Sequence, residues 1–374
     1  MALLDTVDPQ GLEEFSVVFT DRSLNHMSAS FGGVMRDLSS NLKEVYGAAG
    51  CALIPGGGTY AMEAVARQFG QDASALVVRN GWFSYRWSQI FESGAFTSSC
   101  DVMKARRMGN ASQAPFRPAP IEEVVAKIHE VKADIVFAPH VETSAGVILP
   151  DDYISALAAA AHEVGALMVL DCIASGCIWV DLAATGVDVL ISAPQKGWSS
   201  TPSAGVVMLS ERAVERVKAT QSNSFAIDLG KWLSIMETYE EGKHAYHATM
   251  PTDGLVHFRD AVLETKEFGF ENAKSAQWAL GQAVRAMMAE KGVPSVAAEG
   301  FQAPGVVVSY TADGDIQNGS RFAAEGMQIA AGVPLQCDEP EDFRTFRLGL
   351  FGLDKLRDVE VTVARLRRVV DKVL

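Results

Sequence analysis

The chain has 374 residues, of which 48% are hydrophobic and 21% are charged, and its formal net charge is −14 at pH 7. This length exceeds one ordinary core and favours a large domain joined to a smaller one. The acidic balance argues against a nucleic-acid partner, because phosphate backbones are bound by basic surfaces. The sequence shows neither a basic-then-apolar leader nor a membrane-length apolar run, so we expect a cytoplasmic protein with no membrane partner.

The first 20 residues look irregular, residues 20–28 are polar and turn-like, and a helical stripe then spans 31–46. Apolar runs alternate with helical stretches over the following part of the chain. We expect strands at 52–55, 75–78, 98–103, 134–138, 167–170, 187–191 and 206–209. This alternation predicts an α/β domain whose central sheet is mainly parallel and flanked by helices.

The pattern changes towards the C-terminus. Residues 213–241 read mainly as helix, and a second helical stretch runs from Pro251 to about residue 291. Strand-like runs at 306–310 and 346–350 follow, and an apolar stripe at 356–373 predicts a closing helix. We therefore expect a small C-terminal α+β domain (268–374), a large domain (21–267) and an N-terminal segment (1–20) that packs near the small domain.

Two neighbouring strands of the predicted sheet end in an acid and a lysine. The first strand ends at Asp171, and the second is followed by a polar turn with Gln195 and Lys196. In a parallel sheet these ends meet where ligands bind. The pair alone favours a structural ion pair. A reactive lysine, however, needs access and a lowered pKa, and an acid beside it could keep a pyridinium nitrogen protonated, as pyridoxal phosphate requires.

Further strand ends supply what such a cofactor needs. Gly56 to Thr59 form a glycine-rich turn before a helix, whose free N–H groups and positive dipole end suit a phosphate. The alternative interpretation of these glycines is a tight turn that binds no ligand. They do not form a dinucleotide-binding motif, because the later glycine of that motif is absent. Aromatic residues follow the strand before Asn80, and polar residues occupy 140–146. Gln195 could also donate to the phosphate. The convergence of five strand ends is more informative than any one motif.

On these motifs the chain resembles the fold type I pyridoxal-phosphate enzymes of the class V aminotransferase family, in the alanine–glyoxylate and serine–glyoxylate aminotransferase branch. The residues that carry the resemblance stand in the family's order and cover roughly 52–352: GGGTYAMEA, NGWFSYR, HVETSAG, VLDCIASG, SAPQKGW, YHATMP and FRLGLFG. The set is specific, although each piece alone is not. The resemblance implies pyridoxal 5'-phosphate as cofactor and a homodimer with shared active sites.

The resemblance also implies roles for single residues. Lys196 would hold the cofactor as a Schiff base and move the proton, and Asp171 would pair with the pyridinium nitrogen. Further contacts with the cofactor are implied for Gly58, Thr59, Phe83, Thr143, Ile173 and Gln195, and, from the other subunit, for Tyr246 and Thr249. Arg347 matches the arginine that binds the substrate carboxylate, for which a bidentate guanidinium is suited.

The chain departs from the branch near its N-terminus. A Gly-Pro-Gly-like turn usually borders the substrate there, whereas this chain has Thr20 to His26. Arg22, Asn25 and His26 could line the pocket and bind a second polar or anionic group of the substrate. A solvent-exposed loop is an equally weighted alternative. This departure leaves the identity of the amino donor more open than the type of reaction.

The predicted function is ping-pong transfer of an amino group from a small amino acid or amine to glyoxylate or pyruvate. The alternative is a lyase of the same fold, such as a cysteine desulfurase. That class carries a histidine where this chain has Gln195, and its mobile cysteine lies further from the arginine than Cys337 does from Arg347. A non-catalytic binding protein is disfavoured by the presence of Lys196, Asp171 and Arg347. The cysteine spacings match no zinc site, and no metal is expected.

Overall fold

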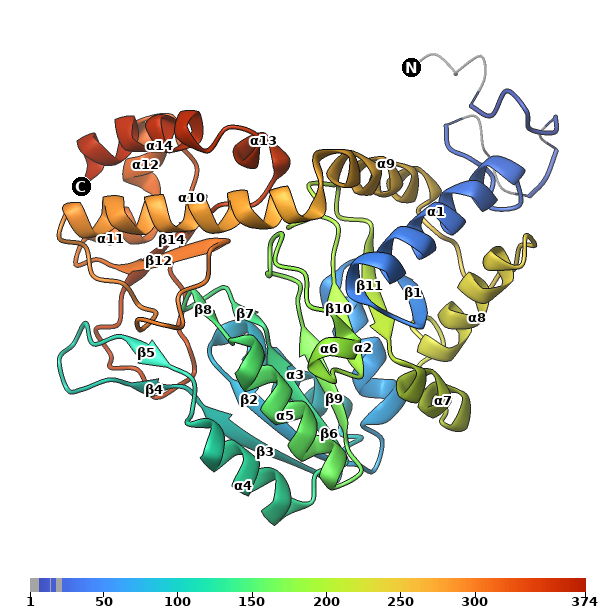
Figure 1. Cartoon of the computed structure of the whole chain (residues 1–374), viewed down its shortest axis with the longest axis horizontal. Helices are drawn as coiled ribbons and strands as arrows, with labels where there is room; N and C mark the ends of the chain where they lie inside the picture. The colour runs from blue at the N-terminus through green and yellow to red at the C-terminus, as the bar shows by residue number, and fades with distance from the viewer. Residues whose placement is uncertain (1–6, 14, 18–21) are drawn as a thin grey trace.

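The computed structural model describes residues 7–13, 15–17 and 22–374. Most helices and strands form a large unit around a seven-stranded sheet, and the rest form a second unit around a three-stranded sheet. Figure 1 shows the long helix α10 (Phe270–Glu290) crossing above the second sheet, with the C-terminal helices beyond it. Residues 1–6, 14 and 18–20 of the predicted N-terminal segment 1–20 lie outside the described residues, and the packing of the segment stays a prediction.

The large sheet has the strand order β1-β11-β10-β9-β6-β2-β3. Its strands are β1 (Gly50–Pro55), β2 (Ser74–Arg79), β3 (Ser99–Lys104), β6 (Ile135–Pro139), β9 (Leu167–Asp171), β10 (Val189–Ser192) and β11 (Ala204–Leu209). The run from β10 to β3 is parallel, whereas β11 pairs antiparallel with both β10 and β1. The predicted mainly parallel sheet is therefore confirmed, with β11 as its reversed strand.

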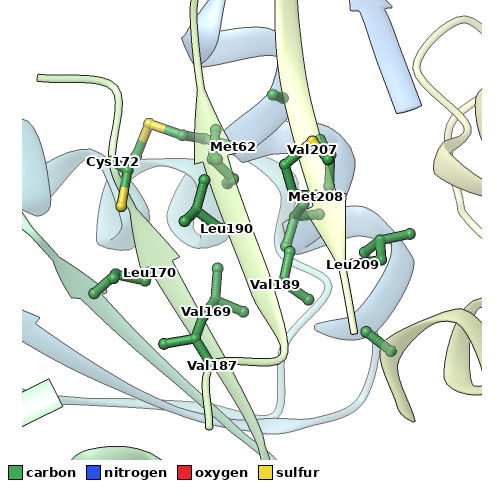
Figure 2. Close-up of a cluster of buried hydrophobic side chains, with 14 of the residues drawn as sticks. Met62, Val169, Leu170, Cys172, Val187, Val189, Leu190, Val207, Met208 and Leu209 are labelled. Atoms are coloured by element: carbon green, nitrogen blue, oxygen red, sulfur yellow. The ribbon is translucent and has the colours of Figure 1, made fainter. Parts of the chain in front are cut away.

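The strands are recognisable in the sequence because the sheet is covered on both faces, so that each strand is a nearly continuous apolar run. Figure 2 shows this core around β9, β10 and β11, where all labelled side chains are buried: Met62, Val169, Leu170, Cys172, Val187, Val189, Leu190, Val207, Met208 and Leu209. Strand β3 is less buried, and its sequence SCDVMK accordingly mixes polar with apolar residues and forms a weaker strand pattern.

Helices on both sides cover the sheet. Figure 1 shows α4 (Ile121–Val131) and α5 (Asp151–Glu163) in front of it and α2 (Gly58–Phe69) and α3 (Trp82–Gly94) behind it. The helix α1 (Ala29–Tyr46) begins where Ser28 accepts a hydrogen bond from the Phe31 N–H and ends at Gly47, whose φ is 61°. The other helices of this unit are α6 (Leu182–Thr185), α7 (Glu211–Ala219), α8 (Leu229–Glu240) and α9 (Thr252–Phe268).

The second unit contains the antiparallel sheet β12-β14-β13. The helical stretch that precedes it is divided at Gly269, whose φ of 94° ends α9 before α10 begins. The remaining elements of this part are β12 (Val306–Tyr310), α11 (Gly314–Gln317), α12 (Ser320–Ala324), β13 (Ala330–Ala331), β14 (Thr345–Gly349), α13 (Leu353–Leu356) and α14 (Val359–Val373). The domain boundary at residues 267 and 268 stays a prediction.

Short two-residue strands occur outside the two main sheets. They are β4 (Arg106–Arg107), β5 (Phe116–Arg117), β7 (Val141–Glu142) and β8 (Val147–Ile148). The pair β7–β8 folds the segment after β6 into a hairpin beside the end of the large sheet. Among the residues that the structure describes, no helix combines the length and the apolar character needed to cross a membrane.

Candidate active site

The carboxyl ends of the parallel strands bring the predicted site segments to one edge of the large sheet. Asp171, the last residue of β9, is paired with Pro139 at the end of β6 and with Ile191 near the end of β10. The strand β1 runs parallel to β10, because both are antiparallel to β11, and it ends at Pro55. The glycine-rich turn, the 140–146 segment and the lysine turn therefore start from this edge, where α/β proteins bind ligands.

Asp171 is a buried carboxylate with one backbone donor. Its side chain belongs to a residue that is 7% exposed, and the Ile173 N–H donates to Oδ1 at 2.9 Å. Burial raises the pKa of Asp171 to about 7, while the Ile173 N–H lowers it, the charge of Glu142 raises it and that of Arg86 lowers it. A cation beside Asp171, such as a protonated ring nitrogen, would favour its ionised form.

Lys196 is half-buried in a turn that is fixed on two sides. A Cβ on Gly197 would lie 2.1 Å from the carbonyl oxygen of Gly176, so the two backbones touch. On the other side the Leu353 N–H of α13 donates to Ser199 Oγ at 2.8 Å. Burial lowers the pKa of Lys196, and the positive charge of Arg347 lowers it further. Both effects favour the neutral amine, which is the nucleophilic form.

The start of α2 offers a cradle for an anion. Gly57 precedes the helix and supplies no side-chain cap for its N–H groups. A Cβ on Gly58 would lie 2.4 Å from Ile173 Cδ1, so glycine lets Ile173 pack directly against the helix start. Arg86 Nη1 donates to Thr59 Oγ1 at 2.9 Å and adds a positive charge there. The buried Oε1 of Gln195 has no hydrogen-bond partner among the described residues.

Two arginines lie near the ring of Phe83. The guanidinium carbons of Arg86 and Arg347 are 5.3 Å and 5.6 Å from the centre of the Phe83 ring. Arg347 comes from β14 of the second sheet and is anchored by its Nε, which donates to Ala331 O at 2.8 Å. Burial lowers the pKa of Arg347, and the charge of Glu142 raises it. Its partly buried cation thus reaches the large unit from the small sheet.

Of the remaining predicted residues, His26 and Tyr246 are in contact with each other. Tyr246 and Thr249 are exposed residues of the segment between α8 and α9, which lies beside α1 (Figure 1). The Tyr246 ring is 62% exposed and its centre is 5.5 Å from that of His26. Arg22 is exposed and Asn25 is half-buried. Within one chain, therefore, contacts join His26 to Tyr246 rather than to Lys196.

Three residues at the site were not predicted. Glu142 and Arg86 stand inside the motifs HVETSAG and NGWFSYR, and Arg86 follows Phe83 at the helical spacing of three that places both on one face. Phe351 follows Arg347 in FRLGLFG, and its ring centre is 5.4 Å from Lys196 Nζ. Thr143, which was predicted, is half-buried next to Glu142.

Cys337 does not have the properties of a catalytic thiol. It is 4% exposed, and its Sγ donates to the carbonyl oxygen of Arg79 at 3.4 Å. Burial raises the pKa of Cys337 to about 12. Because the thiolate is the nucleophilic form, Cys337 does not have the properties of the mobile catalytic cysteine of a desulfurase.

The sheet order and the site at its edge define fold type I of the pyridoxal-phosphate-dependent transferases. An alanine–glyoxylate aminotransferase from Nostoc sp. superposes with a TM-score of 0.79 over 94% of this chain and 89% of that chain, at 20% identity. This likeness concerns the fold. The predicted fold class is confirmed.

The chain belongs to the class V aminotransferase family: the family model "Aminotransferase class-V" matches residues 13–332. It is accordingly a transaminase, and the family implies pyridoxal phosphate as cofactor. The residues at the sheet edge fit that group, since they combine a buried carboxylate, a half-buried lysine and an uncapped helix start with Arg86 beside it. The family predicted from the motifs is confirmed.

Three curated relatives are similar in sequence. The small subunit of a soluble hydrogenase from Synechococcus sp. is 26% identical, over 92% of this chain and 86% of that protein. Alanine–glyoxylate aminotransferase 1 of Saccharomyces cerevisiae is 27% identical, over 65% of this chain and 64% of that protein. A 2-aminoethylphosphonate–pyruvate transaminase of Burkholderia mallei is 28% identical, over 69% of this chain and 67% of that protein.

Proposed function

We propose that this transaminase moves an amino group from a small amino acid or amine to glyoxylate or pyruvate, with pyridoxal phosphate held at Lys196. The observation that carries the proposal is that Arg347 reaches the Phe83 ring from the second sheet and lowers the pKa of Lys196. A carboxylate-binding cation and a reactive amine then face the same substrate. The names of the yeast and Burkholderia relatives contain glyoxylate and pyruvate as acceptors, which supports these two oxo acids.

The side chains divide the work around the cofactor, which when bound supplies an electron sink for the substrate Cα. Asp171 would keep the ring nitrogen protonated. Ile173 and Phe83 would pack against the ring, and Thr143 would contact its phenolic oxygen side. Gly58, Thr59 and Gln195 would hold the phosphate at the start of α2, and Arg86 stands beside them. Lys196 Nζ would move the proton, and Arg347 would bind the substrate carboxylate through paired hydrogen bonds.

We also propose a homodimer in which Tyr246 and Thr249 complete the phosphate site of the other subunit. Their exposure in the single chain supports this role, because a buried contribution to their own site would hide them. His26 would accompany Tyr246, since the two rings are in contact. Arg22 would then stand near the partner's substrate and favour a donor with a distal anionic group. The cytoplasmic location remains a prediction.

A panel of donors tests the function. The purified protein, loaded with pyridoxal phosphate, is offered alanine, serine, aspartate and 2-aminoethylphosphonate, each with glyoxylate and with pyruvate, and the aminated acceptor is quantified. We expect turnover with at least one pair and none in Lys196→Ala. Turnover that survives in Lys196→Ala would reject the mechanism. An unchanged donor profile in Arg22→Ala would remove Arg22 from the pocket.

A further inference from the structure

The carboxylate of Glu142 is fully buried and saturated with hydrogen bonds. Its residue is 0% exposed. Oε1 accepts from the N–H of Phe83 at 3.2 Å and from the N–H and Oγ of Ser144 at 3.1 and 2.7 Å. Oε2 accepts from the N–H and Oγ of Ser84 at 2.9 and 2.7 Å. A buried charge with this many donors is held in one position.

Two of these donors, the N–H groups of Phe83 and Ser84, are free N–H groups at the start of α3. The residue before the helix is Gly81, which has no side chain to cap them. Ser144 Oγ accepts from the Trp82 N–H at 2.9 Å, and Glu142 accepts from the next two N–H groups. The helix dipole also stabilises a negative charge at this end of α3. A Cβ on Gly81 would lie 2.1 Å from Ser144 Oγ, so glycine is what allows the 142–144 segment to come this close.

The same carboxylate thereby fixes two side chains that face the proposed cofactor. The backbone of Phe83 is bound to Glu142 directly. Thr143 lies between Glu142 and Ser144, and both of its neighbours are tied to the start of α3. Movement of Glu142 would therefore displace an aromatic ring and a hydroxyl together. The charge of Glu142 also acts on Arg347, the cation that approaches Phe83 from β14.

We propose that Glu142 is a positioning residue, which holds Phe83 against the cofactor ring and Thr143 beside it and balances the charge of Arg347. The inference rests on the proposed function, because it assumes that pyridoxal phosphate binds between these groups. The competing role is that of a helix cap that stabilises α3 and has no effect on how the cofactor sits.

Glu142→Gln is the informative variant. It keeps the size of the side chain but removes the charge, and it places an NH₂ group against N–H donors. Two readouts need no amino donor: the visible circular dichroism of bound pyridoxal phosphate, and the Kd of the cofactor. We expect the dichroism to fall several-fold and the Kd to rise about tenfold, as for the loss of a charge-assisted hydrogen bond. Peptide 81–86 of the cofactor-free variant should also exchange amide hydrogens faster than wild type.

Glu339 offers a matched control. Its carboxylate accepts from the N–H groups of Leu335, Gln336 and Cys337 at 2.6, 3.0 and 2.8 Å, so it is a similar clamp in the second unit. Glu339→Gln should lose stability and leave the dichroism and the Kd of the cofactor unchanged. If Glu142→Gln does not fold, Ser144→Ala replaces it, because it removes a donor to Glu142 while the charge stays. Ser144→Ala should change both readouts in the same direction.

The proposal would be overturned if the dichroism and the Kd of the cofactor in Glu142→Gln stayed within about twofold of wild type, because the lost interactions predict a tenfold effect. The same holds for Ser144→Ala if that variant is used. Equal changes in Glu339→Gln would also overturn it, since they would show a general loss of stability. A wild-type protein that binds pyridoxal phosphate but aminates no oxo acid would reject the proposed function alone. The Glu142 result would still be readable, because neither readout depends on turnover.

Discussion

Burial moves the pKa values of Asp171 and Lys196 in opposite directions, and both groups are driven towards neutrality. For Lys196 this favours the free amine. For Asp171 it favours the protonated carboxyl group, and a cation placed next to Asp171 would favour the ionised form. A protonated pyridine ring would be such a cation, so the same burial that suits the lysine makes the acid selective for a basic ring.

Asp171 should make the cofactor-free protein less stable as the pH rises. Its pKa in the folded state is about 7, above its ordinary value of about 4. The folded chain therefore holds a proton that the unfolded chain releases between these values, and stability falls as the pH rises through this window. We expect Asp171→Asn to remove this fall. The free energy of unfolding of the variant relative to wild type should therefore be about 1–4 kcal/mol higher at pH 8 than at pH 4.

Urea unfolding of the cofactor-free proteins at pH 4, 6 and 8 measures this difference. His140 acts in the opposite direction, because burial lowers its pKa to about 3. Its contribution is common to both proteins and cancels in the comparison. An equal difference between Asp171→Asn and wild type at all three pH values would contradict the raised pKa.

Cys337→Ala should leave transamination intact. The thiol is buried, its pKa is raised to about 12, and it packs in a cluster formed by residues of both units. We expect activity within about twofold of wild type, because such a cysteine behaves as a small hydrophobic side chain. Donor turnover and sulfide release from cysteine are measured in parallel. Sulfide release that disappears in Cys337→Ala would instead favour the desulfurase.

At the residue scale, the sequence predicted those side chains whose position is set by the strand in which they lie or which they follow. Asp171 and Lys196 follow apolar runs, and Arg347 lies in one, so their positions follow from the strand pattern together with the family resemblance. Glu142 and Arg86 could not be predicted in this way. Their roles depend on which helix start packs against which loop, and that information lies in contacts between distant segments.

The elements were largely predictable, and their arrangement was not. Buried strands are apolar on both faces, so the runs of the buried strands were visible in the sequence, whereas the less buried β3 gave a weaker pattern. The reversed direction of β11 was not predicted, because strand direction depends on partners that the strand's own residues do not specify. The interruption between α9 and α10 was also missed: Gly269 has a φ of 94°, and a single glycine within a helical pattern does not reveal its backbone conformation.

The turn that carries Lys196 should not tolerate a side chain at Gly197. The added Cβ would meet backbone atoms of Gly176, at 2.1 Å from O and 2.4 Å from C, and no rotamer change can relieve that contact. We expect Gly197→Ala to destabilise the protein by about 3 kcal/mol or more. The visible absorbance of the bound cofactor should also be lost. Thermal unfolding and absorbance spectra measure the two effects.

Gly33→Ala is the control for that substitution. Gly33 lies in α1, and nothing stands within 4 Å of an added Cβ. It should raise stability by about 0.5–1 kcal/mol, since alanine is the better helix former. A Gly197→Ala protein that matches wild type in both measurements would show that the turn is not held as described.

At the scale of the whole molecule, the site depends on two units that are tied together. Arg347 is supplied by the second sheet, whereas Asp171 and Lys196 belong to the first. Arg285 of α10 links the units, because its Nη2 donates to Ala303 O at 2.7 Å and to Gly146 O at 3.4 Å. The 140–146 segment, which carries Thr143, is thus connected to the unit that supplies Arg347, the arginine proposed to bind the substrate.

Two inactive variants should restore each other if the proposed dimer shares its sites. Lys196→Ala removes the lysine, and Tyr246→Ala removes the residue proposed to act in the other subunit. A refolded one-to-one mixture contains mixed dimers with one intact site, so about a quarter of wild-type activity should return at limiting cofactor. Each variant refolded alone is the control. No recovery in a mixture that forms mixed dimers would place Tyr246 in its own subunit's site.

A single-turnover assay tests most directly whether this chain is a transaminase that works through Lys196. Protein loaded with pyridoxal phosphate is mixed with an active donor in the absence of any oxo acid, and the oxo product is counted per subunit. Amino transfer predicts about one product per site, after which the reaction stops until glyoxylate or pyruvate is added. Continued product formation without an acceptor, as a lyase would show, would contradict the account.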